Sequence, residues 1–108
     1  MDTPTALAAL AALAQESRLA VFRLLVQAGP AGMAASKIAA RLDIAPSSLS
    51  FHLKELTHAA LLSARQDGRF VIYCANFAAM NALVGFLTEN CCGGLPCGVT
   101  TLQPPACA

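Results

Sequence analysis

The sequence predicts a mainly α-helical domain that carries one β-hairpin and pairs with a second copy as a homodimer. Apolar residues recur at helical spacing in several separate segments. Asp67 and Gly68 lie between two short stretches with β-forming residues, which is a strong hairpin signal. The hydrophobic fraction of 56% indicates an additional face to bury, and a homodimer is the simplest way to cover it.

Length and charge narrow the class of protein. The 108 residues fit one domain. All seven lysines and arginines lie between residues 18 and 69, where three acidic residues oppose them and leave a local net charge of +4. This excess favours a nucleic acid as partner, with an ordinary solvated surface as the alternative.

No segment is predicted to span a membrane. The longest apolar stretch, residues 6–14, is well short of the roughly 20 residues that a bilayer span needs. The N-terminus carries Asp2 and no basic residue, which argues against a signal peptide. We therefore expect a cytoplasmic protein.

Two helices are predicted at the start of the chain. Residues 4–14 form the first, and its leucines share one stripe at three-residue intervals: Leu7, Leu10 and Leu13. The second helix follows, with Ser17 as a candidate N-cap, and it ends at Gly29 and Pro30. Its buried face is expected to consist of Leu19, Phe22, Leu25 and Val26.

The next two helices are predicted to form a helix-turn-helix. Ser36 opens a short helix whose inward side chains are Ile38, Ala39 and Leu42. Residues 43–45 make a tight connection, and Pro46 suits the first position of the following helix, residues 46–57. The inner face of that helix holds Leu49, Leu53 and Leu56, and its outer face holds Ser47, Ser50, Phe51, Lys54 and His58. Two short helices joined by a turn of about three residues are typical of a helix-turn-helix.

A wing and a last helix complete the predicted domain. Residues 62–65 and 70–75 are predicted to be strands joined by residues 66–69, and a hairpin directly after a helix-turn-helix is a wing. Residues 77–89 form the last helix, with Met80, Leu83, Val84 and Leu87 on one face. The expected order is therefore α-α-α-α-β-β-α. Residues 1–90 are the winged helix-turn-helix domain for DNA binding and dimerisation, followed by an irregular, cysteine-bearing tail, residues 91–108.

The second helix of the helix-turn-helix has the features of a recognition helix for DNA. Short polar side chains near its N-terminus let the backbone enter the major groove closely, and serine hydroxyls reach phosphates or base edges. The candidates are Ser47, Ser48 and Ser50. Lys54 is predicted to contact a phosphate, which positions the protein without specifying sequence.

Four further candidate contacts each have a structural alternative. Phe51 is expected either to contact a thymine methyl group or to pack against the wing. His52 is expected to be half-buried and hydrogen-bonded to backbone, with DNA contact as the alternative. Arg65 and Arg69 flank the tip of the wing, where they can meet phosphates or the minor groove, and simple solvated charge is the alternative for both.

Several segments together resemble the ArsR/SmtB family of metal-responsive repressors. They are ESRL (16–19), APSSLSFHLKEL (45–56), RQDGR (65–69) and Tyr73. The resemblance covers about residues 5–89, and the recognition-helix string is its most specific part. It implies a winged-helix homodimer, joined through the first and last helices, that binds a palindromic operator of double-stranded DNA. It also implies repression of a resistance operon, relieved when a ligand binds.

The sequence departs from the ligand sites best known in that family. The arsenic pattern places a Cys-x-Cys in the helix before the recognition helix, but residues 35–42 contain no cysteine. The family's zinc site uses Asp and His on the last helix, and residues 77–89 contain no histidine. The ligand site must therefore be sought elsewhere in the chain.

The cysteines suggest a site in the tail. Reduced thiols are the rule in the cytosol, so five cysteines favour metal binding or redox chemistry over a disulfide framework. Cys91, Cys92 and Cys97 lie on one short loop, with glycines and a proline between them to supply the turn. Three thiolates suit As(III) or Sb(III), because soft ligands select soft ions. Some arsenic-responsive members of the family have a similar tail cluster.

Other functions for these cysteines stay open. Cadmium, lead or mercury could use the same three thiolates, and Cys107 could complete a four-ligand zinc site. A thiol redox switch is a further alternative. An enzyme is not expected, because the sequence lacks a Cys-x-x-Cys at a helix start and any βαβ pattern, and no organic cofactor is expected. Cys74 is predicted to be a small core residue.

Overall fold

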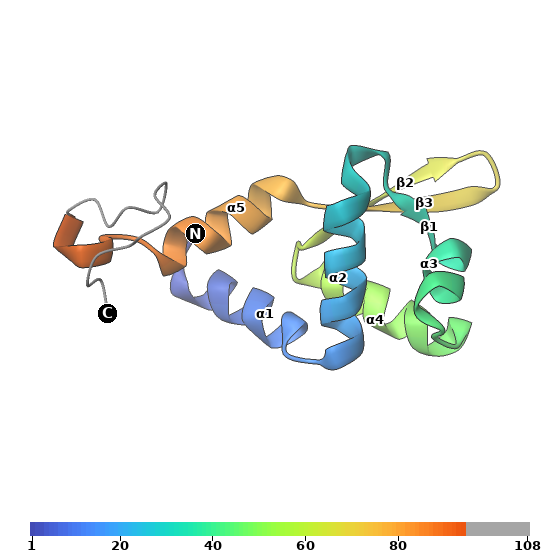
Figure 1. Ribbon diagram of the computed structural model, residues 1–108, viewed down its shortest axis with the longest axis horizontal. Coiled ribbons are helices and arrows are strands. Elements are labelled where there is room, and N and C mark those ends of the chain that lie inside the picture. The colour runs from blue at the N-terminus through green and yellow to red at the C-terminus, as the bar shows by residue number, and fades with distance from the viewer. Residues whose placement is uncertain (95–108) are drawn as a thin grey trace.

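A helical body carries a three-stranded antiparallel sheet at one end (Figure 1). The computed structural model describes residues 1–94, and it confirms the predicted order of four helices, a hairpin and a last helix. In the structure the elements that the sequence predicted have these bounds: α1 (Thr3–Leu13), α2 (Glu16–Ala28), α3 (Ala35–Leu42), α4 (Pro46–His58), β2 (Leu62–Asp67), β3 (Phe70–Ala75) and α5 (Phe77–Leu87). Three short elements were not predicted: η1 (Gly29–Ala31), β1 (Met33–Ala34) and η2 (Cys91–Gly94). None of the helices within residues 1–94 has the length and apolar character needed to cross a membrane.

Side-chain caps fix where three of the helices begin. The Asp2 carboxylate accepts a hydrogen bond from the backbone N–H of Thr5, and its hydrogen bonds to Thr5 lower its pKa. The Gln15 side chain accepts from the backbone N–H of Arg18 at 2.8 Å. The predicted cap at Ser17 is therefore wrong, because the extended backbone of Gln15 starts α2 one residue later, at Glu16. The side chain of Asn76 caps α5 in the same way.

The buried faces of α1 and α2 differ from the leucine pattern. On α1 the side chains that pack into the core are alanines: Ala6, Ala9 and Ala12. Leu7 and Leu10 are turned outward, with Leu7 60% exposed, and of the leucine stripe only Leu13 packs against the core. On α2, Val21, Phe22 and Leu25 are buried, whereas Leu19 was expected inside and is 44% exposed. Periodicity could not choose between these stripes, because both are apolar and alanine allows the closer helix approach.

The helix-turn-helix follows the predicted pattern. Asp43 ends α3 in the left-handed conformation, with φ +53°, and Pro46 is the first residue of α4. Leu49, Leu53 and Leu56 are all buried on the inner face of α4. Each buried leucine contributes about 1.5–3 kcal/mol relative to an exposed one, so this face holds α4 firmly against the core.

The wing is a hairpin with a two-residue turn. Asp67 pairs with Phe70, so only Gly68 and Arg69 form the connection, and the predicted four-residue turn was two residues too long. Gly68 has φ +61° at the first central position, where such hairpins favour glycine. Strand β1 pairs with β3 and extends the wing to three strands in the order β1-β3-β2. Its two residues are too few to show a strand period in the sequence.

Gly32 lies where the chain passes closest to β3. A Cβ at this position would lie 2.5 Å from the backbone oxygen of Tyr73 and 2.6 Å from the Sγ of Cys74. Gly29, three residues earlier, has almost the same backbone conformation, with φ +76° and ψ −165° against +69° and −163°. A Cβ at Gly29 would meet nothing within 4 Å. A side chain at either glycine would therefore strain the backbone, but only one at Gly32 would also clash with β3.

We predict that Gly32→Ala destabilises the protein more than Gly29→Ala. Both substitutions place alanine in a region that only glycine adopts readily, at a cost of about 1–3 kcal/mol. Gly32→Ala adds the overpacking against β3, a further cost of about 1–3 kcal/mol. Denaturant unfolding of both variants measures the difference, and equal losses of unfolding free energy would show that β3 yields to the added methyl group.

Candidate DNA interface and cysteine cluster

The outer face of α4 is exposed to solvent in the described part of the chain. Its predicted DNA-contacting side chains are exposed: Ser47, Ser48, Ser50, Phe51 and Lys54. Phe51 is 55% exposed, so the interpretation of its ring as filler against the wing is wrong. A large apolar ring with this exposure is unusual on a polar helix face and suits an apolar surface such as a thymine methyl group.

His52 occupies the edge of this face. Its side chain is half-buried, as predicted, and its ring meets that of Phe51 edge to face, with the centroids 5.9 Å apart. The predicted bond to backbone is wrong for Nδ1, which is buried and has no hydrogen-bond partner among residues 1–94. Near the middle of α4 both the N–H groups and the carbonyls of the backbone are engaged in the hydrogen bonds of the helix, so neither is left as a partner for Nδ1.

Two arginines of the wing have different surroundings. Arg69 is exposed in the turn, next to Phe70, whose side chain is 59% exposed. Arg65 lies further back on β2, opposite Ile72, and its guanidinium turns toward η1. Nη2 donates to the backbone oxygen of Ala31 at 2.8 Å, and Nη1 lies 3.1 Å from the Sγ of Cys74. The expectation that Arg65 flanks the wing tip is therefore wrong, because the nearby carbonyls of η1 attract its charge.

Cys74 is half-buried, and it belongs to this contact between the wing and η1. Its Sγ donates to the backbone oxygen of Pro30 at 3.4 Å and receives the Arg65 guanidinium. The prediction of a small core residue holds only in part, since β3 is an accessible strand here and not the centre of the core. The sequence did not predict the contact between Arg65 and Pro30, because the two residues lie 35 positions apart in the chain.

Two of the predicted thiolate ligands come together just beyond α5. The Sγ atoms of Cys91 and Cys92 lie 3.8 Å apart in η2, and both side chains are half-buried. The left-handed backbone of Cys92, φ +56°, allows adjacent side chains to converge. Cys97 and Cys107 lie outside the described residues. Within residues 1–94 no three or more His, Cys, Asp and Glu side chains gather in a group that could hold a metal ion.

An exposed apolar face covers α1 and α5, which pack side by side at the end opposite the wing (Figure 1). Large apolar side chains on it are well exposed: Leu7, Leu10, Val84 and Leu87. Of the face predicted for α5, only Leu83 is buried within the chain. The last helix also ends at Leu87, two residues earlier than predicted.

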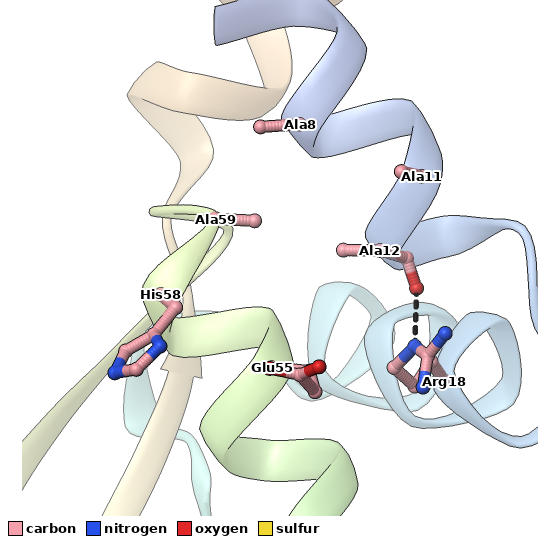
Figure 2. A pocket seen from close by; sticks show the side chains of 7 residues that line it. All are labelled: Ala8, Ala11, Ala12, Arg18, Glu55, His58 and Ala59. Atoms are coloured by element: carbon pink, nitrogen blue, oxygen red, sulfur yellow. Dashed lines mark hydrogen bonds between the residues drawn. The ribbon is translucent and has the colours of Figure 1, made fainter.

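A hollow of about 390 Å³ separates α1 from α4 (Figure 2). Alanines of α1 line one side of it, and Glu55 and His58 of α4 line the other (Figure 2). The Nε of Arg18 donates to the backbone oxygen of Ala12 at 2.7 Å and so ties the end of α1 to the start of α2. This hollow was not predictable from sequence patterns, because its walls come from three separate helices.

Comparison with known proteins identifies relatives of the fold. A helix-turn-helix domain model matches residues 13–63, and no curated protein sequence matches the chain. An ArsR-like transcriptional regulator from Rhodococcus sp. RHA1 is similar, with 28% identity over 78% of this chain and 76% of that one, and a TM-score of 0.70.

Two further structures are similar. The homodimeric winged helix-turn-helix DNA-binding domain Mb0332 from Mycobacterium bovis, a possible ArsR-family regulator, has 27% identity over 81% of each chain and a TM-score of 0.64. A possible transcriptional regulator for arsenical resistance has 30% identity over 73% of this chain and 82% of that one, with a TM-score of 0.58.

The exposed ring of Phe51 leads to a prediction that separates binding from stability. Phe51→Ala should change the free energy of unfolding by no more than about 0.5 kcal/mol, and it should weaken binding to DNA selected with the wild-type protein. Leu53→Ala is the control, since its buried side chain should cost about 2–5 kcal/mol of stability. Unchanged DNA affinity in Phe51→Ala would remove this ring from the interface.

Proposed function

We propose that this chain, a winged helix-turn-helix protein with the fold of the ArsR-family transcriptional regulators, is a homodimeric repressor that As(III) or Sb(III) releases from its operator. One observation carries the choice of ligand. The sulfurs of Cys91 and Cys92 converge directly beyond α5, the helix that carries the exposed apolar face. An ion bound there acts on the end of a helix that we assign to the dimer interface.

The DNA-binding part of the proposal starts from α4 and the wing. Serines at the start of α4 and the ring of Phe51 face outward and are accessible to base edges in the major groove. Lys54 and Arg69 are exposed cations on the same two elements and suit phosphates, which position a protein on the duplex. His52 is a lesser candidate, because its side chain is half-buried and its Nδ1 is fully buried.

The homodimer follows from the apolar face of α1 and α5. Exposed leucines and valine on two adjacent helices would cost free energy in water, and a symmetric partner covers such a face with its own copy. A relative of the same fold is homodimeric. Two recognition helices in such a dimer meet half-sites about one helical turn apart, which is roughly 34–36 Å on the DNA, and so a palindromic operator is expected.

The ligand part of the proposal starts from the two sulfurs. Two thiolates that share a tetrahedral ion, with metal–sulfur bonds of about 2.3 Å, lie about 3.8 Å apart. The narrower angles of a three-coordinate pyramid bring them somewhat closer, so this distance indicates a shared ion without choosing between the two geometries. The separation of the Cys91 and Cys92 sulfurs is 3.8 Å. Cys92 is disulfide-bonded in this structure, so in the proposal it is reduced before the two thiolates share one ion. Cys97 supplies the third thiolate in the proposal. A set of three soft ligands without a fourth favours As(III) or Sb(III) over zinc.

Release from DNA is an allosteric effect in this account. Binding three thiolates to one ion constrains the segment after α5 and changes how α5 and α1 pack across the dimer. A small rotation at this interface shifts the spacing of the two recognition helices, so both lose their half-sites together. The ion need only favour the state off the DNA by about 1–3 kcal/mol.

We predict that Cys91→Ser, Cys92→Ser and Cys97→Ser each preserve DNA binding and abolish release by arsenite. None of the three cysteines lies on α4, whereas a pyramidal site loses one of its three ligands. Fluorescence anisotropy of labelled operator DNA, titrated with arsenite, measures both properties. Cys74→Ser and Cys107→Ser are the controls and should respond like the wild type.

The outcomes also separate the alternative ligands. If all three tail variants still release DNA with arsenite, the site lies elsewhere. Loss of the response in Cys107→Ser would indicate four ligands and favour zinc. Release by cadmium, lead or mercury without a response to arsenite would indicate another soft metal, and release by peroxide alone would indicate a redox switch.

The dimer interface gives a second prediction. Leu87→Asp or Val84→Asp should convert the protein to a monomer and greatly weaken DNA binding, because a charge on the apolar face loses its solvation on association. Analytical ultracentrifugation measures the mass of each variant. Val71→Asp, which changes an exposed apolar residue of β3, should stay dimeric. A dimer that survives both substitutions on α5 would place the interface on another face.

A further inference from the structure

Arg65 connects two parts of the fold that are far apart in the sequence. It lies on β2, yet its guanidinium donates to the backbone oxygens of Pro30 and Ala31, at 3.4 and 2.8 Å, and contacts the Cys74 Sγ at 3.1 Å. Pro30 and Ala31 belong to η1, which follows the end of α2 and leads through β1 into the helix-turn-helix. The wing is therefore tied to the chain that precedes the helix-turn-helix.

The charge of Arg65 has a physical reason to turn this way. The last carbonyls of a helical segment lack partners within the segment and carry partial negative charge. Gly29 is the acceptor for the N–H of Gly32 in η1, and the next two carbonyls receive the guanidinium instead. Arginine suits this position because its planar group presents several donors in a fixed geometry, which lysine does not.

The contact lies beside a second close approach. Gly32 brings the chain so near to β3 that any side chain there would meet the Tyr73 backbone and the Cys74 sulfur. Strand β1 then pairs with β3, with Met33 opposite Tyr73. The wing is thus held to the segment of residues 30–34 by two contacts: the pairing of β1 with β3, and the Arg65 guanidinium on η1.

We propose that Arg65 is a positioning residue for DNA binding and not a phosphate contact. It holds the wing at the angle at which Arg69, in the turn, reaches the DNA. This inference rests on the DNA-binding function proposed above. Arg65 acts through the wing, so removing its side chain should weaken DNA binding only by the amount that the contact of Arg69 contributes.

A double-mutant cycle tests this dependence. The affinity for operator DNA is measured for the wild type, Arg65→Ala, Arg69→Ala and the double variant at several salt concentrations. Arg69→Ala should weaken binding in the wild type and lower the salt dependence of binding by about one phosphate contact per protomer. When Arg65 is already alanine, the additional substitution Arg69→Ala should change the affinity for DNA by less than about twofold, because the tip of the wing is already displaced from the DNA.

A charge-conserving variant separates positioning from phosphate contact. Arg65→Lys keeps the positive charge, so it would preserve most of a phosphate contact. Lysine at this position should not anchor the wing, because a single ammonium cannot bind two carbonyls and a sulfur in the way the planar guanidinium does. We expect Arg65→Lys to bind as weakly as Arg65→Ala. Wild-type affinity in Arg65→Lys, or effects of Arg65→Ala and Arg69→Ala that simply multiply, would overturn the proposal.

Hydrogen exchange without DNA tests the anchor separately. Amides of η1, β1 and β3 should exchange faster in Arg65→Ala than in the wild type, while those on the inner half of α4 should keep their protection. Unchanged exchange in η1 and the wing would overturn the anchoring. This measurement tests the anchoring by Arg65 even if the chain binds no operator and the proposed repressor function fails.

Discussion

The packing of α4 against the core is the constraint on which the functional surfaces depend. Leu49, Leu53 and Leu56 are buried, so the opposite face of the helix has to point into solvent. That face carries serines near its start and Phe51 one turn further. The same packing leads the chain from α4 into β2, which places the wing beside α3 and the start of the helix-turn-helix. A recognition helix and a wing on one side of the molecule are the consequence.

The sequence predicted the elements whose pattern is local. The period of α4 and the glycine turn of the wing both lie within a few residues, and the structure confirms both. The exposure of Leu7 and Leu19 was not predicted, because periodicity identifies an apolar helix face but does not tell whether this chain or a second copy covers it. The contacts of Arg65 were out of reach, since its partners lie 34 and 35 residues away. The three cysteines of the proposed site were predicted from their spacing, and within the described residues Cys91 and Cys92 lie close together.

The arrangement of helices provides a physical connection between the two proposed sites. The segment with Cys91 and Cys92 follows α5, α5 packs on α1, and α1 packs on α4. The hollow between α1 and α4 is lined by alanines of α1 on one side and by Glu55 and His58 of α4 on the other. A change at the cysteines can therefore reach the recognition helix within one protomer as well as across the dimer. Spatial connection alone does not measure coupling, which is a free energy between two binding events.

The central claim is that the metalloid and the operator are coupled through this dimer, and linkage makes that coupling reciprocal. The most direct measurement is the affinity for arsenite, followed by thiolate–arsenic absorption, for the free dimer and for the dimer saturated with operator DNA. The account predicts weaker arsenite binding to the DNA complex, by the same factor by which arsenite weakens DNA binding, on the order of 5- to 150-fold. Equal arsenite affinity with and without DNA would contradict it.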